Sequence, residues 1–236
     1  MEERRTITLD LFGDMACFTR PEQKVERISY NVPTPSAIRG IVEAIYCKPI
    51  EFYYEINEIQ VMNPIKKFEF TTNETKEKIN VKNTNYINQI PKKGDHGITQ
   101  RRNEYLKDVY YRVTITIVKR DDAPPSVNII SLYNQFMRRL NNGKCFHQPY
   151  FGTKECICHF SPPNLELKKT PIQQSEYFGY ILYDTFKIDN ITPLDTSKKN
   201  QDKVIDRTIF NCKMENGVIK IPPYKSNEVF HIVQGG

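Results

Sequence analysis

Thr34-Pro-Ser-Ala-Ile-Arg-Gly-Ile-Val-Glu-Ala-Ile-Tyr46 is the stretch that decides how this chain folds. Its apolar residues recur at i, i+3, i+4 and i+7, the spacing of one helix face; they are Ile38, Ile41, Val42 and Ile45. Pro35 and Ser36 are typical of a helix start. Pro49 ends the helix, because the residue before a proline disfavours the α region. The stretch therefore predicts an amphipathic helix over residues 36–46.

Basic residues surround this helix. Arg20, Lys24 and Arg27 lie in the loop before it, and Arg39 lies on the same less buried side of the helix as Tyr46. Such cations suit the phosphates of a nucleic acid better than a small apolar substrate. The alternative for Tyr46 is a half-buried aromatic at a helix end, with its hydroxyl in water.

Alternating apolar residues, or enrichment in aromatic and β-branched residues, predict strands on both sides of this helix. The predicted strands cover residues 6–11, 51–62 and 108–119, a second helix covers 129–140, and residues 145–160 are β-like. Residues 63–106 are mostly polar and are interpreted as a long, partly mobile insertion. The order β-α-β, insertion, β-α-β predicts an α+β, ferredoxin-like (RRM-like) split βαβ domain over residues 1–161. The aromatic signature of RRM strands is missing, so the sheet face need not stack bases.

Residues 162–236 have the pattern of a small C-terminal antiparallel β domain. Residues 177–186 read as a strand, and Asn216-Gly217 between two apolar stretches predicts a hairpin. Pro162-Pro163 is the expected domain boundary.

Composition narrows the class of protein. The 236 residues carry a formal net charge of +6, which allows an anionic partner without requiring one. The chain lacks the roughly 18 consecutive apolar residues of a membrane span. Met1-Glu-Glu-Arg-Arg5 is not followed by a hydrophobic region, so no secretory signal is expected. Six cysteines then indicate reduced thiols and a cytoplasmic protein.

Two further groups of residues are candidate sites. Cysteines and histidines gather between Cys145 and His159, but their spacing is poor for zinc, so we expect no metal and interpret most of these cysteines as small buried hydrophobes. Arg101 and Arg102 lead into the strand over 108–119, either as a phosphate clamp or as a solvated basic loop. Acidic residues do not cluster in a two-metal pattern, so a nuclease built on this chain is expected to work without metal.

Several motifs together resemble the CRISPR-associated Cas-five family, subtype d. The motifs are Gly13-Asp-x-Ala-Cys-Phe-Thr-Arg-Pro-Glu-x-Lys-Val-Glu-Arg-x-Ser-Tyr30, Thr34-Pro-Ser-Ala-x-Arg-Gly-Ile-x-Glu-Ala-Ile-Tyr46-x-Lys-Pro49, Gln100-Arg101, Leu106-Lys-Asp-Val109, Arg138-Arg-Leu140 and Gly143-x-Cys-Phe-His-Gln-Pro-Tyr150 followed by Gly152. The resemblance implies a ferredoxin-like domain with a small β domain. It implies cofactor-free, metal-independent cleavage of the CRISPR repeat in precursor RNA. It also implies partners: the crRNA, whose 5′ handle stays bound, and the other subunits of a type I-C interference complex, with double-stranded DNA left open.

The resemblance also suggests catalytic residues. Tyr46 falls on the family's motif tyrosine, and Lys119 is the candidate for its lysine. The family's adjacent histidine is replaced by Arg120, so His147 is the candidate base, although a histidine in such a loop more often fixes the local backbone by hydrogen bonds. Such a set can use the RNA 2′-OH as nucleophile, with Lys119 and Arg120 binding the phosphate. The alternative is a non-catalytic subunit that caps the crRNA 5′ handle.

Overall fold

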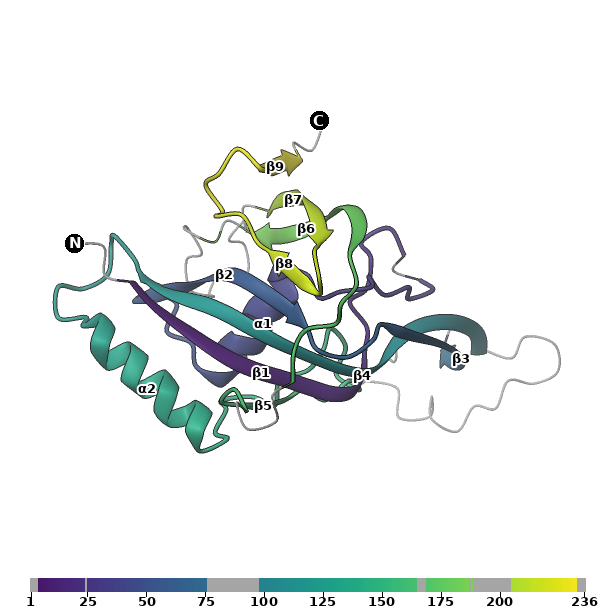
Figure 1. Ribbon diagram of the computed structural model, residues 1–236, viewed down its shortest axis with the longest axis horizontal. Coiled ribbons are helices and arrows are strands. Elements are labelled where there is room, and N and C mark those ends of the chain that lie inside the picture. Colours follow the sequence, from purple (N-terminus) through teal and green to yellow (C-terminus); the bar gives the residue numbers. More distant parts are fainter. Residues whose placement is uncertain are drawn as a thin grey trace, which may run out of the picture.

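The computed structural model describes residues 4–23, 25–75, 98–164, 169–186, 188 and 205–232. These residues form a mixed α+β fold of mostly antiparallel strands (Figure 1). Its elements are β1 (Arg4–Ala16), α1 (Pro35–Ile45), β2 (Phe52–Val61), β3 (Lys66–Thr75), β4 (Ile98–Lys119), α2 (Ile129–Asn141), β5 (His159–Ser161), β6 (Glu176–Phe186), β7 (Ile205–Met214), β8 (Val218–Lys220) and β9 (Val229–Ile232). The α+β class expected from the sequence is therefore confirmed.

The larger sheet has the strand order β5-β1-β4-β2-β8, with all neighbours antiparallel. Strand β4 lies between β1 and β2, so the two strands that flank α1 in sequence are not neighbours in the sheet. The central strand is apolar on one face because Val113, Ile115 and Ile117 are fully buried there. This places the core of the molecule on one side of β4.

Helix α1 forms as the sequence indicates. The Thr34 hydroxyl accepts a hydrogen bond from the Ala37 N–H (3.2 Å), which caps the first turn, and Pro35 follows as the first helical residue. The apolar face of the helix is buried, and Tyr46 ends it in an extended conformation. The helix therefore delivers Tyr46 to a fixed place beside the start of β2.

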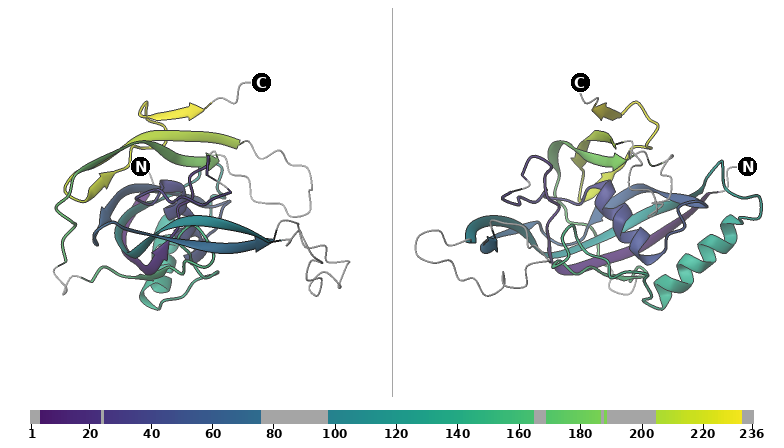
Figure 2. Two further views of the ribbon diagram at one scale, coloured as in Figure 1. Left: turned by 90° about the vertical axis from the view of Figure 1, so that its right-hand side faces the viewer. Right: turned by 180° about the vertical axis from the view of Figure 1, so that it is seen from behind.

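Both helices cover the same face of the larger sheet. The Phe136 ring of α2 meets the Tyr54 ring of β2 at 5.9 Å. Seen from behind, α1 crosses in front of the strands and α2 lies beside it (Figure 2). Asn128 caps α2 through a bond from the Ile130 N–H (2.8 Å). The opposite face of the sheet carries no helix among the described residues.

Residues 169–175, which precede β6, run over that opposite face (Figure 1). The Asn164 N–H donates to the Asp10 carboxylate (3.0 Å), which also accepts two bonds from Arg112 (2.7 and 3.0 Å) and one from the Tyr110 hydroxyl (2.7 Å). The Ile172 N–H then bonds to the Val61 carbonyl (2.9 Å). Asp10 is the buried centre that ties Asn164 to β1 and β4.

The segment expected to be an insertion, residues 63–106, begins and ends in paired strands. Strand β3 pairs with the first half of β4 from Lys66↔Lys107 to Thr75↔Ile98. The hairpin extends away from the rest of the sheet (Figure 1). Phe68 and Phe70 stack on each other and contact Tyr105, which gives the hairpin its own apolar surface. Residues 76–97 lie outside the described residues.

The tail forms a second sheet of order β6-β7-β9. It is linked to the rest of the fold, because β8 from the same tail pairs with β2 in the larger sheet. The division into domains 1–161 and 162–236 stays a prediction. No helix among the described residues is long and apolar enough to cross a membrane.

Candidate active site

Tyr46 lies where α1 ends and the chain turns into β2. Its N–H bonds to the Val42 carbonyl (3.0 Å), and its ring packs 5.5 Å from the Phe52 ring. The Tyr54 hydroxyl donates to the Tyr46 carbonyl (2.6 Å). Tyr46 is only 7% exposed, so it is more buried than the helix-end aromatic of the sequence-based alternative.

Two cations approach the Tyr46 side chain. The Arg139 guanidinium of α2 lies over the ring, with Cζ 5.4 Å from the ring centroid, and Nη1 donates to the Ile45 carbonyl (3.0 Å). Lys48 follows Tyr46 by two residues, and Nζ binds the Glu51 carboxylate (2.7 Å). Burial raises the pKa of Tyr46, and Lys48 and Arg139 oppose this shift. The hydroxyl is therefore protonated at neutral pH.

Lys119 lies on the same face of the sheet as Tyr46. It is directly opposite Phe52 in the pairing of β4 with β2, and opposite residues project to the same face. Because the Phe52 ring packs on Tyr46, the structure brings the predicted lysine and the predicted tyrosine to one region.

The loop after α2 joins the same region. The N–H groups of Phe146 and His147 both donate to the Ala44 carbonyl of α1 (2.8 and 3.1 Å). The His147 side chain is exposed and contacts the Phe146 ring at a centroid distance of 4.3 Å. The backbone of His147 therefore helps to cap α1, two residues before Tyr46.

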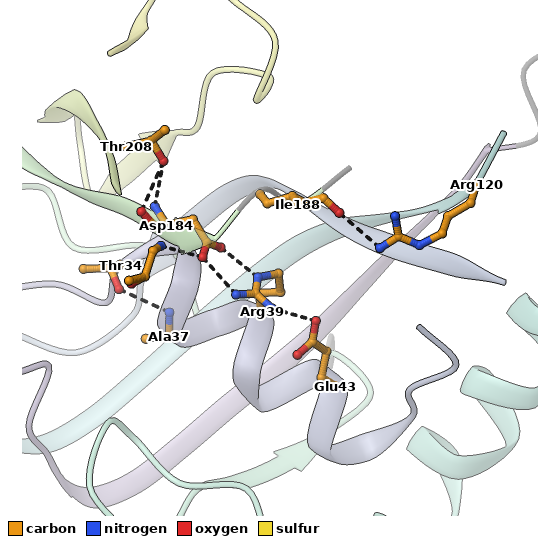
Figure 3. A network of polar contacts seen from close by, with 9 residues as sticks. Thr34, Ala37, Arg39, Glu43, Arg120, Asp184, Ile188 and Thr208 are labelled. Carbon is orange, nitrogen blue, oxygen red and sulfur yellow. Dashed lines mark hydrogen bonds and ion pairs between the residues drawn. The ribbon is translucent and has the colours of Figure 1, made fainter. Parts of the chain in front are cut away.

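Arg39 and Arg120 were expected to contact RNA, and the structure gives both a structural role (Figure 3). Arg39 is 7% exposed and donates to both oxygens of Asp184 on β6 (2.7 and 2.9 Å) and to Glu43 (2.8 Å). Arg120 is also buried and donates to the Pro49 and Ile188 carbonyls (2.6 and 3.1 Å). Their guanidinium groups already hold backbone or carboxylate oxygens, which corrects the expectation for both residues.

The other predicted RNA contacts lie away from Tyr46, toward the beginning of β4. Arg101 binds Glu74 (2.8 Å) and the Val25 carbonyl (3.2 Å), whereas the Arg102 side chain is 75% exposed, with Glu69 only at 3.8 Å. Arg27 pairs with Glu155 (3.1 Å), and the Arg20 guanidinium lies 5.1 Å from the Tyr30 ring centroid. Lys24 lies outside the described residues.

The cysteines behave as the sequence suggested. Cys17, Cys156, Cys158 and Cys212 are buried, and burial raises the pKa of Cys156 to about 11. Within the part of the chain that the structure describes, no three His, Cys, Asp or Glu residues gather in a group that could hold a metal ion.

Sequence reasoning did not single out Lys48 and Arg139 as site residues. Both stand in the quoted motifs, Lys48 in Tyr46-x-Lys-Pro49 and Arg139 in Arg138-Arg-Leu140. Lys48 is near Tyr46 because it follows it by two residues, whereas Arg139 reaches the Tyr46 ring only through the packing of α2 beside α1, which is a tertiary contact.

Fold and site together define an α+β protein whose candidate site combines a tyrosine with several cations. Residues 6–222 match the profile of the CRISPR-associated protein family Cas5d. Two curated relatives, from Thermus thermophilus and Mannheimia succiniciproducens, are called CRISPR pre-crRNA endoribonuclease Cas5d. The relative from Thermus thermophilus is 34% identical over 97% of this chain and 96% of its own length. The relative from Mannheimia succiniciproducens is 34% identical over 94% of this chain and 97% of its own length. The chain therefore belongs to the Cas5d family.

Two solved structures share the fold. One is described as a CRISPR-associated protein, with a TM-score of 0.67 and 20% identity over 98% of this chain and 99% of the other. The second is the functionally uncharacterized protein SMU1763c from Streptococcus mutans, with a TM-score of 0.65 and 23% identity over 96% and 98%.

Proposed function

We propose that this chain is a metal-independent endoribonuclease that cleaves CRISPR repeat hairpins in precursor crRNA. The RNA 2′-OH is the nucleophile, and the protein stays bound to the 5′ handle as a subunit of the type I-C interference complex. The names of the two curated relatives support the substrate and the reaction. The observation that carries the proposal is Tyr46, held at the end of α1 beneath the Arg139 guanidinium and on the same sheet face as Lys119.

The chemistry follows from the protonation state of Tyr46. Because burial raises its pKa, the hydroxyl acts as a hydrogen-bonding group that orients the 2′-OH or the phosphate, and not as a strong base. Lys119, Lys48 and Arg139 supply positive charge for the phosphorane oxygens, an effect that is often the largest single contribution to catalysis. His147, exposed at the same helix end, is the candidate group for proton transfer.

We further propose that the larger sheet is a variant of the ferredoxin-like split βαβ fold. The order β5-β1-β4-β2, with a helix after β1 and another after β4, supports this assignment. Strands β3 and β8 are then additions to the common arrangement.

A second function is a non-catalytic subunit that caps the crRNA 5′ handle. The observation that favours it is Arg120, which stands where the family has a histidine and is buried against the Pro49 and Ile188 carbonyls. In that case the cations around Tyr46 bind the RNA without cutting it.

The two functions are separated by incubating the purified protein with its own repeat RNA in EDTA. We expect cleavage, an upstream product with a 2′,3′-cyclic phosphate or its 3′-phosphate derivative, and complete protection by one 2′-deoxy substitution just 5′ of the scissile bond. Binding without cleavage would support the capping role. Cleavage of the deoxy substrate, or a 3′-hydroxyl end, would exclude the 2′-OH mechanism.

Lys119→Ala tests the placement of the lysine in the same assay. We expect a slower single-turnover rate with little change in folding, measured by thermal unfolding. A wild-type rate would mean that another cation near Tyr46 serves the phosphate.

A further inference from the structure

Three aromatic side chains form a row across three neighbouring strands of the larger sheet. Phe12 on β1 lies directly opposite Tyr110 on β4 and directly opposite His159 on β5. The Phe12 and His159 rings are stacked, with centroids 5.7 Å apart and planes at 28°. Phe12 and Tyr110 meet edge to face at 6.0 Å. We call Phe12, Tyr110 and His159 the aromatic row.

The aromatic row lies on the face of the sheet that carries no helix among the described residues. Successive residues of a strand point to opposite faces. Leu11 and Tyr111 are buried with the helices, so Phe12 and Tyr110 project the other way. Phe12 is 39% exposed and His159 is exposed as well. Tyr46 is therefore on the opposite face, and the nine-residue step along β4 from Tyr110 to Lys119 separates the two regions by about 30 Å.

Lysines stand beside one end of the row. The Lys169 ammonium lies 4.5 Å from the centroid of the Tyr110 ring and also binds Asn63. Lys66 and Lys107 are directly opposite each other on β3 and β4, both are exposed, and they line one shallow pocket together with Tyr110. Like charges in directly opposite positions repel each other. An anion bound between Lys66 and Lys107 would offset this repulsion.

The Tyr110 end of the row is held in place by a hydrogen bond. The Tyr110 hydroxyl donates to Asp10 (2.7 Å), and the neighbouring Arg112 binds the same carboxylate. Rings held in this way lose little conformational freedom when a flat ligand stacks on them. Two exposed carboxylates, Asp14 and Asp108, flank the row, so phosphates are expected at the three lysines and not beside these acids.

We propose that the aromatic row and the lysines Lys66, Lys107 and Lys169 form a second RNA site, which binds a single-stranded segment by base stacking on Phe12 and His159 and by phosphate contacts at the lysines. Every base has a flat face, so such a site binds with little sequence preference. The proposal rests on the proposed function in that RNA is the ligand, and it assigns the single-stranded part of that ligand to the face opposite Tyr46.

The test is fluorescence anisotropy with short labelled oligouridine and oligoadenosine RNAs, which have no hairpin. Phe12→Leu and His159→Leu keep apolar volume but remove the rings. We expect each to weaken binding at least about fivefold, the lower end of measured base–aromatic stacking energies. Tyr180→Leu and Phe230→Leu are matched controls, because these exposed rings form a contact of 5.6 Å on the second sheet. Unchanged binding by the row variants, or equal losses in the controls, would overturn the proposal.

A cleavage assay separates this site from the proposed reaction. At saturating protein, Phe12→Leu should cleave hairpin RNA at the wild-type single-turnover rate while needing more protein to reach saturation. If the wild-type protein cuts no RNA but Phe12→Leu still weakens oligonucleotide binding, the proposed reaction fails and the second site stands. A lower cleavage rate at saturating protein in Phe12→Leu, together with unchanged oligonucleotide binding, would rule out the second RNA site.

Discussion

Tyr46 is buried and is the proposed catalytic tyrosine, so removing its hydroxyl is the most direct test of the reaction. We predict that Tyr46→Phe keeps the fold, because the ring contact with Phe52 and the backbone bonds of the helix end remain. Single-turnover cleavage should fall at least about tenfold, as expected when a hydrogen bond that orients the reacting group is lost. RNA binding should stay near the wild-type value. A wild-type rate would place the chemistry elsewhere in the molecule.

Arg139 is predicted to position Tyr46. Its guanidinium both covers the ring and binds the Ile45 carbonyl, and its Nε is buried without a hydrogen-bond partner. Arg139→Gln should lower the cleavage rate at saturating RNA by about tenfold, because a small displacement of a catalytic group is costly. Arg139→Lys should recover part of the rate, since it keeps the charge.

Arg138→Gln is the matched control for this prediction. Arg138 precedes Arg139 on α2, is exposed and binds Gln135 (2.9 Å). We expect it to leave the cleavage rate unchanged. Equal losses in the two glutamine variants would indicate a general effect of charge on RNA binding.

At the scale of elements, Asp10 links β1, β4 and the segment that leads to β6. Burial raises its pKa, but bonds from Arg112, Tyr110 and Asn164 outweigh burial and leave the pKa below its ordinary value of 3.8. The carboxylate therefore stabilises the fold above about pH 4 and loses this contribution as the pH falls through the lowered pKa. Asp10→Asn should cost about 3 kcal/mol at pH 7, because it leaves Arg112 without its partner.

Urea unfolding of Asp10→Asn and wild type at several pH values measures this effect. The difference in the free energy of unfolding should be largest near neutral pH and shrink below about pH 4. Asp14→Asn, an exposed position on the same strand, is the control and should show almost no difference. A difference for Asp10→Asn that does not change with pH would contradict the predicted role of its charge.

The sequence predicted the elements whose pattern is local. The stripe of Ile38, Ile41, Val42 and Ile45 placed α1 within one residue at each end. Enrichment in aromatic and β-branched residues located β2, and alternation located the second half of β4. The β3–β4 hairpin was missed because Lys, Thr and Asn dominate it, while its apolar contacts come from three aromatic rings. Residues 145–160 were predicted to be β-like. The β pairing in this stretch is limited to the start of β5 and the isolated bridge Tyr150↔Ile157.

The site was harder to predict, because its contacts join residues that are far apart in the sequence. Glu43 lies only four residues from Arg39, but Asp184, which binds both the Nε and the Nη2 of Arg39, is 145 residues away and cannot be linked to it from the sequence. The aromatic row was missed for the same reason, since Phe12, Tyr110 and His159 meet only through strand pairing. Tyr46 and Lys119 were assigned as candidate catalytic residues through the resemblance and not through spacing.

At the scale of the whole molecule, RNA affinity should depend steeply on salt. Each phosphate neutralised adds about 0.7–0.9 to the slope of log affinity against log salt. Arg102→Ala should lower this slope by about one phosphate, because the Arg102 side chain is 75% exposed and only loosely paired. Arg101→Ala should change it less, since Glu74 already binds Arg101 at 2.8 Å. Salt titrations of RNA binding by both variants test this prediction. An unchanged slope for Arg102→Ala would indicate that the Gln-Arg-Arg stretch is a solvated strand end that does not contact phosphate.

The late position of strand β8 in the sequence affects folding during synthesis on the ribosome. Residues 218–220 supply the neighbour of β2, which is synthesised far earlier. Until they emerge, the outer edge of β2 presents unpaired N–H and C=O groups, a template for wrong pairing with other chains. Pairings between distant segments form late, because closing the long loop between them costs chain entropy before the new contacts can stabilise the pairing. The nascent chain therefore carries an open sheet edge through most of translation, and a stop codon before residue 218 would leave that edge permanently exposed.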